Sequence, residues 1–274
     1  MANLPSYVSP SSAASFEGCP RRWEFKYIQR LAEPSHQAAL VGSFAHIVLE
    51  ELCELDPVQR TQSEAKSIAK RLWPEFAEDE DYQSLELGQD DARSFRWQAW
   101  LAIAGLWDIE DPANVNVVST EQKITTSLGD VPFVGIIDRV DRTDGQLVVS
   151  DYKSGTLPGR RWRDDKVQQV MLYAAALESS TGEQPERARL LYLGQQILDV
   201  NVTANRLSEA TGQLSDTWTS IEQACSSDEF DAKPSVLCGW CPFVTQCEPG
   251  KKEVVSRHEQ GKFPTHAPSL ALVT

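Results

Sequence analysis

Residues 134–155, with the sequence VGIIDRVDRTDGQLVVSDYKSG, decide the expected fold of this 274-residue chain. The dipeptide Asp144-Gly145 stands between two runs rich in β-branched residues, a pattern that favours a β-hairpin with a two-residue turn. In the register set by such a turn, Asp138 faces Asp151 on the neighbouring strand. Directly opposed side chains project to the same side of a sheet, with Cβ atoms about 4.5–5.5 Å apart. The sequence therefore predicts a pair of carboxylates on one face of the hairpin.

This carboxylate pair predicts a site for a divalent cation. Two carboxylates so close repel each other unless a positive charge lies between them. Because side chains alternate along a strand, Lys153 lies on the same face as Asp151, and Tyr152 lies on the other. Mg²⁺ and Mn²⁺ prefer carboxylate and water ligands, and the lysine can orient or deprotonate an attacking water or stabilise charge on a phosphate. The alternative interpretation is a surface hairpin whose charged residues are only solvated.

The rest of the chain predicts an α/β fold with a small mixed sheet. Runs of β-branched residues predict strands, and apolar residues at helical spacing predict helices. The strands are expected at 115–124, 131–140, 146–153 and twice within 187–202, and the helices at 10–30, 37–55, 164–179 and 204–225. We expect a single domain over 1–274, with a helical elaboration at about 56–112 and a loose polar tail at 250–274.

Three tryptophans lie in the helical elaboration, namely Trp97, Trp100 and Trp107. They recur at helical spacing, which favours a role as packing anchors. Platforms for stacking nucleic-acid bases are the alternative interpretation.

Two of the predicted helices carry polar side chains on a shared face. His46 and Glu50 are four residues apart, and Gly42 lies one turn before His46. The glycine leaves room for close approach of substrate or backbone, and an imidazole can bind a transition metal such as Mn²⁺. A histidine satisfied by its core neighbours is the alternative. On the other helix, Gln169 and Tyr173 share a face that is equally typical of a half-buried helix edge.

The cysteines predict a metal centre built from both ends of the chain. Six occur: Cys19, Cys53, Cys225, Cys238, Cys241 and Cys247. The last three form a C-x2-C-x5-C pattern that can grip one centre, and Cys19 is the candidate fourth ligand. Four thiolates accept either Zn²⁺ or an iron–sulfur cluster, so the residues alone leave both open. Cys53 and Cys225 are expected to be small buried hydrophobic residues.

Composition and charge limit the class of protein. Hydrophobic residues make up 41% and charged residues 24%, as in soluble globular proteins. No apolar run reaches the roughly 18 residues of a membrane span, and the N-terminus lacks the layout of a secretion signal, which predicts a cytoplasmic protein. The net charge of −14 argues mildly against nucleic-acid binding. A basic cluster nevertheless offers either a phosphate-binding groove or a solvated loop: Lys153, Arg160, Arg161, Arg163 and Lys166.

Five sequence segments and the terminal cysteines together resemble the RecB-family branch of PD-(D/E)XK nucleases. In chain order the segments are SPSSAASFEGCPRRWEFKY, GSFAHIVLE, GIIDRVD, SDYKSG and QQVMLYA. The resemblance is to small exonucleases related to the CRISPR-adaptation nuclease and to the nuclease domain of AddB-type helicase–nucleases. It implies a restriction-endonuclease-like core and a four-cysteine cluster that joins the N- and C-terminal segments. The helical region at about 56–112 matches no part of this family and would be a helical insertion in the core.

The resemblance also implies roles for single residues. The ligands of Mg²⁺ or Mn²⁺ would be His46, Asp138, Asp151 and the backbone carbonyl of Tyr152. Lys153 would be the catalytic lysine, and Gln169 and Tyr173 would fill the Q-x-x-x-Y motif near the active site and DNA. The resemblance favours a [4Fe-4S] cluster over zinc, with a cluster-binding segment at about 226–249 and these ligands: Cys19, Cys238, Cys241 and Cys247.

Residues and resemblance together predict metal-dependent hydrolysis of DNA by an exonuclease that serves DNA repair, recombination, or phage or CRISPR DNA processing. The expected substrate is DNA with single-stranded or free ends, with a helicase or recombination partner and no membrane. Backbone phosphates would contact Arg160, Arg161 and Arg163, and Trp162 would stack on an unpaired base. The alternatives are a catalytically inactive iron–sulfur DNA-binding or assembly subunit, and a zinc-stabilised hydrolase of another phosphoester.

Overall fold

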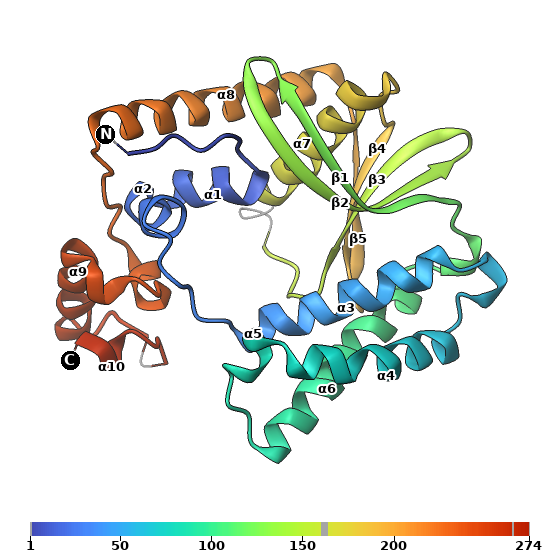
Figure 1. The fold of residues 1–274 in the computed structure, drawn as a ribbon, viewed down its shortest axis with the longest axis horizontal. Helices are drawn as coiled ribbons and strands as arrows, with labels where there is room; N and C mark the ends of the chain where they lie inside the picture. The colour runs from blue at the N-terminus through green and yellow to red at the C-terminus, as the bar shows by residue number, and fades with distance from the viewer. Residues whose placement is uncertain (1, 160–163, 265, 274) are drawn as a thin grey trace. The chain divides into compact units, whose positions relative to one another are not determined.

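The chain forms two compact units. The computed structural model, drawn as a ribbon in Figure 1, describes residues 2–159, 164–264 and 266–273. One unit, here called the sheet unit, comprises Ser35–Gly212. The other, here called the thiol unit, combines Met1–Pro34 with Gln213–Thr274. Among the described residues, no helix is both long and apolar enough to cross a membrane.

The sheet unit is built on five strands that lie side by side in chain order. They are β1 (Val117–Leu128), β2 (Val131–Thr143), β3 (Gln146–Lys153), β4 (Arg187–Tyr192) and β5 (Gln196–Asn201). Neighbouring strands are antiparallel except β3 and β4, which are parallel. A parallel pair needs a crossover connection, and it contains helix α7 (Asp164–Thr181). This mixed sheet flanked by helices confirms the predicted α/β fold.

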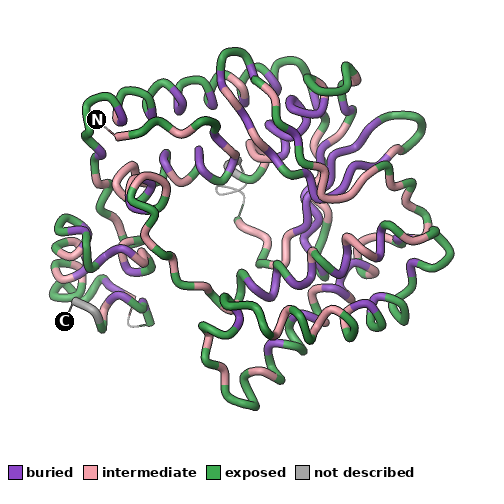
Figure 2. The backbone as a smooth tube through the Cα atoms, in the orientation of Figure 1, coloured by how far each residue is buried: buried purple, intermediate pink, exposed green. Residues whose placement is uncertain are grey.

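The turn at Asp144-Gly145 sets the register that the sequence predicted. The two residues have φ values of 52° and 85°, and a type I′ turn requires positive φ at both positions. The pairing of β2 with β3 ends at Arg139 and Ser150. The next residue on each strand is one of the two predicted site aspartates. Figure 2 shows that buried residues dominate these two strands, so the aspartates lie at the margin of the core.

A helical layer packs on the long helix α3 (Gln37–Glu54) of the sheet unit. It contains α4 (Gln62–Glu78), α5 (Glu80–Gln83) and α6 (Gln89–Ala104), with short 3₁₀ turns at Pro57–Gln59, Gly105–Asp108 and Pro112–Asn114. Apolar residues of these helices form one core, in which Leu49, Phe95 and Ile103 are fully buried. Trp100 and Trp107 pack against this core, as expected of packing anchors. Trp97 does not, since it is 60% exposed.

Gly105 permits a close approach between the helical layer and the turn after β4. A Cβ added at Gly105 would lie 2.4 Å from the backbone nitrogen of Gly194, which donates a hydrogen bond to the Gly105 carbonyl. Gly105→Ala should therefore lower the free energy of unfolding by about 1–3 kcal/mol, as overpacking does. The control is Gly212→Ala, because Gly212 lies in a helix with open space around it. There alanine should stabilise by about 0.5–1 kcal/mol, and urea denaturation of both variants gives the contrast.

The thiol unit combines helices from both ends of the chain. Its elements are α1 (Pro10–Gly18), α2 (Pro20–Trp23), the π-helical turn Glu24–Ile28, the C-terminal part of α8 (Ala204–Ser227), the 3₁₀ turns Val236–Trp240 and Val244–Gln246, α9 (Glu248–Glu259) and α10 (Leu270–Val273). Trp23 is fully buried. Its ring packs against Phe16 and Phe230, and its Nε1 donates to the Ser12 hydroxyl at 2.9 Å. The N-terminal segment is thus fixed to the C-terminal one by a buried aromatic cluster.

The predicted loose tail at 250–274 is wrong for its first part, since α9 is helical through Glu259. Only Gly250 and Val254 of this helix are buried, so the sequence shows too few apolar positions to reveal a helical period. Val254 packs with Val244, Phe263 and Ala267 in a small core of its own. The ordering of this segment therefore depends on tertiary packing.

Candidate active site

All six side chains singled out for the site line one pocket of about 620 Å³ in the sheet unit. They are His46 from α3, Asp138 from β2, Asp151 and Lys153 from β3, and Gln169 and Tyr173 from α7. Glu50 and Glu121 also line the pocket, so its described residues bring four carboxylates together with one ammonium group. The predicted DNA contacts at 160–163 lie outside the residues that the structure describes.

Tyr152 connects Asp138 and His46 through its backbone. Its N–H donates to Oδ2 of Asp138 at 2.7 Å, and its carbonyl oxygen lies 3.1 Å from Nε2 of His46. Nδ1 of His46 lies 3.4 Å from the same Asp138 oxygen. One backbone residue thereby orients two of the predicted ligands and brings its own carbonyl beside them.

The carboxylates of the pocket lie in an environment that disfavours their negative charge. Burial, and then the charge of Asp151, raises the pKa of Asp138 to about 7. Burial, and then the charge of Asp138, raises the pKa of Glu121 to about 7. Burial lowers the pKa of His46. A cation would reverse the rise in the two carboxylate pKa values and would lower the pKa of His46 further, since it stabilises both the anionic carboxylate and the neutral imidazole.

The set of donor atoms fits a divalent metal ion. Ligand atoms of His46, Glu121 and Asp138 all lie within 4.8 Å of one another. Carboxylate oxygens suit Mg²⁺ and Mn²⁺, and an added imidazole suits a transition metal such as Mn²⁺. The residues present can therefore hold the kind of ion that the sequence predicted.

Lys153 and Gln169 both contact Asp151 in the site. The Lys153 ammonium contacts Oδ2 of Asp151 and donates to Oε1 of Gln169 at 3.2 Å. Nε2 of Gln169 lies 3.3 Å from Oδ1 of Asp151 and 3.0 Å from the Tyr173 hydroxyl. The amide oxygen of Gln169 thus holds the lysine in place, while its amide nitrogen contacts the aspartate and the tyrosine.

A model of the PD-(D/E)XK nuclease superfamily matches residues 7–248 of the chain. The chain belongs to this superfamily. The match spans the pocket and the four predicted cluster cysteines. The five-stranded mixed sheet flanked by helices is the restriction-endonuclease-like core expected of such a nuclease.

One solved structure has a fold similar to that of this nuclease. A candidate exonuclease from Eubacterium rectale is 17% identical, with a TM-score of 0.54 over 83% of this chain and 84% of that chain. A protein named SSO0001 is 14% identical, with a TM-score of 0.41 over 90% of this chain and 88% of that chain. The second likeness is too distant to bear on the fold. No curated protein sequence matches the nuclease.

Glu121 is the residue that sequence reasoning missed, although the sequence holds a signal for it. β1 and β2 are joined at Gly129-Asp130, and Leu128 pairs with Val131 across this two-residue turn. The register places Glu121 opposite Asp138, by the same argument that placed Asp138 opposite Asp151. Glu121 also has a φ of 42°, a left-handed conformation that is uncommon for a residue with a side chain and that clusters at functional sites.

Gly42 permits a close approach, but of a side chain rather than of the substrate or backbone that the sequence suggested. A Cβ at this position would lie 2.6 Å from the hydroxyl of Ser154, directly after β3. The glycine lets α3 lie against the end of this strand. The helix thereby brings His46, one turn later, to the aspartates of the sheet.

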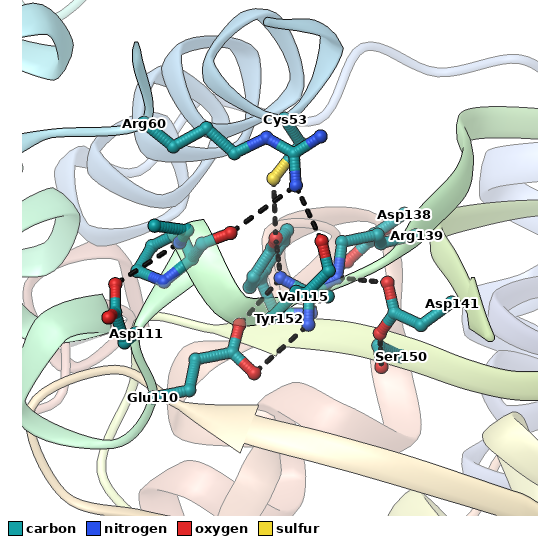
Figure 3. Close-up of polar contacts among 12 residues, drawn as sticks. Cys53, Arg60, Glu110, Asp111, Val115, Asp138, Arg139, Asp141, Ser150 and Tyr152 are labelled. Carbon is teal, nitrogen blue, oxygen red and sulfur yellow. Dashed lines mark hydrogen bonds and ion pairs between the residues drawn. The ribbon is translucent and has the colours of Figure 1, made fainter. Parts of the chain in front are cut away.

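A buried polar network supports Tyr152 from the far side of the sheet (Figure 3). Arg139 is fully buried; it donates to the Tyr152 hydroxyl at 2.8 Å and to both carboxylate oxygens of Glu110, at 2.6 and 3.1 Å. Its Nε lies 2.8 Å from Oδ1 of Asp141. Cys53, which is buried as expected, lies 3.5 Å from the Tyr152 hydroxyl. The residue whose backbone orients Asp138 and His46 is therefore fixed at its side chain as well.

The thiol unit brings the four predicted cluster cysteines around one small cavity. The backbone N–H groups of Lys233 and Ser235 donate to the sulfurs of Cys19 and Cys238, each at 3.4 Å. Burial raises the pKa of Cys238 and of Cys241, so both thiols favour the neutral form unless a cationic centre binds them. Cys225, expected to be a buried hydrophobic residue, is buried and does not line the cavity.

The spacing of the four sulfurs can be compared with the two kinds of metal centre. One tetrahedral zinc ion, with Zn–S bonds of about 2.3 Å, would hold sulfurs about 3.8 Å apart. In the described part of the chain, no three of these sulfurs lie within 4.8 Å of one another. The enclosed space is only about 20 Å³, enough for about one water molecule. Binding of a larger centre therefore requires the cysteine side chains to turn outward.

Proposed function

We propose that this nuclease hydrolyses DNA phosphodiester bonds with Mg²⁺ or Mn²⁺ held by His46, Asp138, Asp151 and the backbone carbonyl of Tyr152. The observation that carries the proposal is the single pocket in which carboxylates, an imidazole and a lysine from four elements meet. The raised pKa values of Asp138 and Glu121 support a cation there. Glu121 lies close enough to be a further ligand.

The metal would polarise the phosphate and lower the pKa of a water molecule. Lys153 carries a positive charge on the same face as Asp151 and stabilises the negative charge that the phosphate gains during hydrolysis. Gln169 holds the lysine through its amide oxygen. Tyr173 in turn contacts the amide nitrogen of Gln169, so both motif residues on α7 position the lysine.

We infer that the substrate is DNA with single-stranded or free ends and that the nuclease is an exonuclease of the RecB branch. The order of the motifs along the chain supports this inference, as does the resemblance to CRISPR-adaptation and AddB-type nucleases. A helicase or recombination partner and a role in DNA repair, recombination, or phage or CRISPR DNA processing follow from the same resemblance.

The proposed activity is tested with end-labelled linear DNA and with circular DNA, each incubated with Mn²⁺ or Mg²⁺. An exonuclease should shorten the linear DNA and spare the covalently closed circle. Asp151→Asn should lose both cleavage and Mn²⁺ binding. Binding of the linear DNA by the wild-type chain, with no cleavage in either metal, would instead identify an inactive DNA-binding subunit.

For the thiol unit, we propose a [4Fe-4S] cluster held by Cys19, Cys238, Cys241 and Cys247. The C-x2-C-x5-C spacing and the approach of Cys19 to the other three support it. Because its ligands come from both ends of the chain, the centre would act as a structural staple.

Cys19→Ser should lose iron and sulfide from anaerobically purified protein and lower its melting temperature, because it frees the N-terminal segment from the C-terminal trio. Cys225→Ser is the matched control, since this buried cysteine does not line the cavity. It should keep its iron. Stoichiometric zinc with no iron or sulfide in the wild-type protein would refute the cluster.

A further inference from the structure

A second pocket, of about 290 Å³, lies in the helical layer of the sheet unit. It is formed by α3, α4 and α6, and it combines aromatic with basic side chains. The aromatic ones are Phe44, Trp73 and Trp100, and the basic ones are Lys66, Lys70 and Arg96. Neither the catalytic site nor the thiol cavity uses any of these residues.

The three cations of this pocket have no acidic partner in the described part of the chain. Lys66, Lys70 and Arg96 are all exposed, and none forms an ion pair there. Other exposed cations on the same two helices do pair, since Arg71 contacts Glu51 and Arg93 lies 3.5 Å from Asp90. In a chain of net charge −14, three cations left together around one pocket make a local surface that attracts an anion.

Two of the cations already lie over indole rings. The Lys66 ammonium is 5.6 Å from the centroid of the Trp100 ring, and the Arg96 guanidinium carbon is 5.6 Å from that of Trp73. Such cation–π pairs fix flexible side chains above a flat apolar surface. The pocket therefore combines positive charge with aromatic surface. Such a pocket suits a ligand that has both an aromatic ring and a negative charge.

The aromatic floor of the pocket is rigid. Trp73 packs edge-on against Phe44 at 5.5 Å and against Tyr82 at 5.3 Å, and it contacts Phe95 at 5.9 Å. Trp100 is half-buried and packs on the same core. A rigid ring loses little conformational freedom when a ligand stacks on it, which favours binding.

We propose that this pocket binds an unpaired nucleotide of a DNA strand, with the base against the tryptophans and the phosphates beside Lys66, Lys70 and Arg96. Aromatic stacking combined with cations is how proteins bind single strands without sequence preference. A base within a duplex has both faces covered by its neighbours and cannot stack here. The inference rests on the proposed function, because it takes DNA as the ligand.

The position of the pocket gives it a role in holding the substrate. Gly42 and His46 of α3 line the catalytic pocket, while Phe44, almost opposite them on the same helix, lines the second one. A helix with its side chains is about 10–12 Å across. The second pocket is therefore a separate point of attachment for the strand, one helix away from the site of cleavage.

The test measures the fluorescence anisotropy of labelled oligothymidylate with the full chain in EDTA, so that nothing is cleaved. Arg96→Glu and Trp100→Ala should each weaken binding by at least about fivefold. Arg96→Glu should also reduce the slope of log affinity against log salt by about 0.7, the contribution of one phosphate on a single strand. Arg93→Glu is the matched control, since it makes the same charge change on the same helix away from the pocket, and its affinity should change by less than about twofold.

Equal weakening by Arg96→Glu and Arg93→Glu would overturn the proposal, because net charge alone would then explain it. So would wild-type binding of duplex as tight as that of single strand, or competition by free thymidine monophosphate as strong as that by the oligonucleotide. Lys66→Glu keeps the test decisive if Trp100→Ala fails to fold. If Arg96→Glu and Arg93→Glu have the same affinity for the oligonucleotide while the wild-type chain cleaves DNA, this binding site is refuted and the nuclease function is not. If only Arg96→Glu weakens binding but the wild-type chain cleaves no DNA, the proposed nuclease function is refuted and this binding site is not.

Discussion

Lys153→Ala should slow DNA cleavage about 100- to 1000-fold, the effect of removing one charged or hydrogen-bonding group that stabilises a transition state. The lysine contacts Asp151 and Gln169 in the candidate active site. As an ammonium it cannot be a metal ligand. Its removal also takes away a positive charge beside the carboxylates, so Mn²⁺ should bind as tightly as before or more tightly.

Single-turnover cleavage of linear DNA and calorimetric titration with Mn²⁺ separate these two effects. Lys123→Ala is the matched control, because Lys123 is an exposed lysine on β1 that does not line the pocket. It should cleave at the wild-type rate. If Lys153→Ala also cleaves at that rate, the lysine is a solvated surface group and the hairpin is not the active site.

Arg139→Met should lower the free energy of unfolding by about 3–5 kcal/mol, the usual cost of removing one partner from a buried ion pair. The guanidinium is fully buried and neutralises Glu110 and Asp141, which methionine would leave without a cation in the interior (Figure 3). The Tyr152 hydroxyl would lose its donor as well. Because Tyr152 orients Asp138 and His46, the affinity for Mn²⁺ should fall together with stability.

The same strand offers the control for this substitution. Arg142, three residues later on β2, pairs with Glu183 at the surface, where solvent screens the charges. Arg142→Met should therefore cost far less stability in a urea titration than Arg139→Met. Equal losses for the two variants would show that the buried network contributes no more than an exposed ion pair.

The fold and much of the site could be predicted because tight turns carry positional information. A two-residue turn at Asp144-Gly145 fixes the register of two strands, and the register places Asp138 and Asp151 together. The same reasoning at Gly129-Asp130 would have found Glu121, which instead looked like one polar residue in a β-rich run. The alternation of side chains along a strand predicts which face of the sheet a residue lies on. Only the turn predicts which residue lies opposite it on the neighbouring strand.

Other features depend on contacts between residues far apart in the chain, which no local pattern contains. The sequence predicts an exposed Arg139, because arginine is mostly found at the surface, and gives no sign that this side chain is buried. The helix at 248–259 buries too few residues to show a period. Trp100 was correctly predicted to pack on the core, yet its spacing could not show that Lys66 would lie over its ring.

The origin of the thiol unit in both ends of the chain has a consequence for how the protein is made. Domains generally fold as units during synthesis, N-terminal residues first. The sheet unit is complete once residue 212 has left the ribosome. The N-terminal segment, with the apolar side chains of Phe16 and Trp23, must wait for the last part of the chain before it can bury them. We therefore expect a stage of synthesis in which the sheet unit is folded while the aromatic side chains of the N-terminal segment are still exposed. A chaperone could bind this exposed segment.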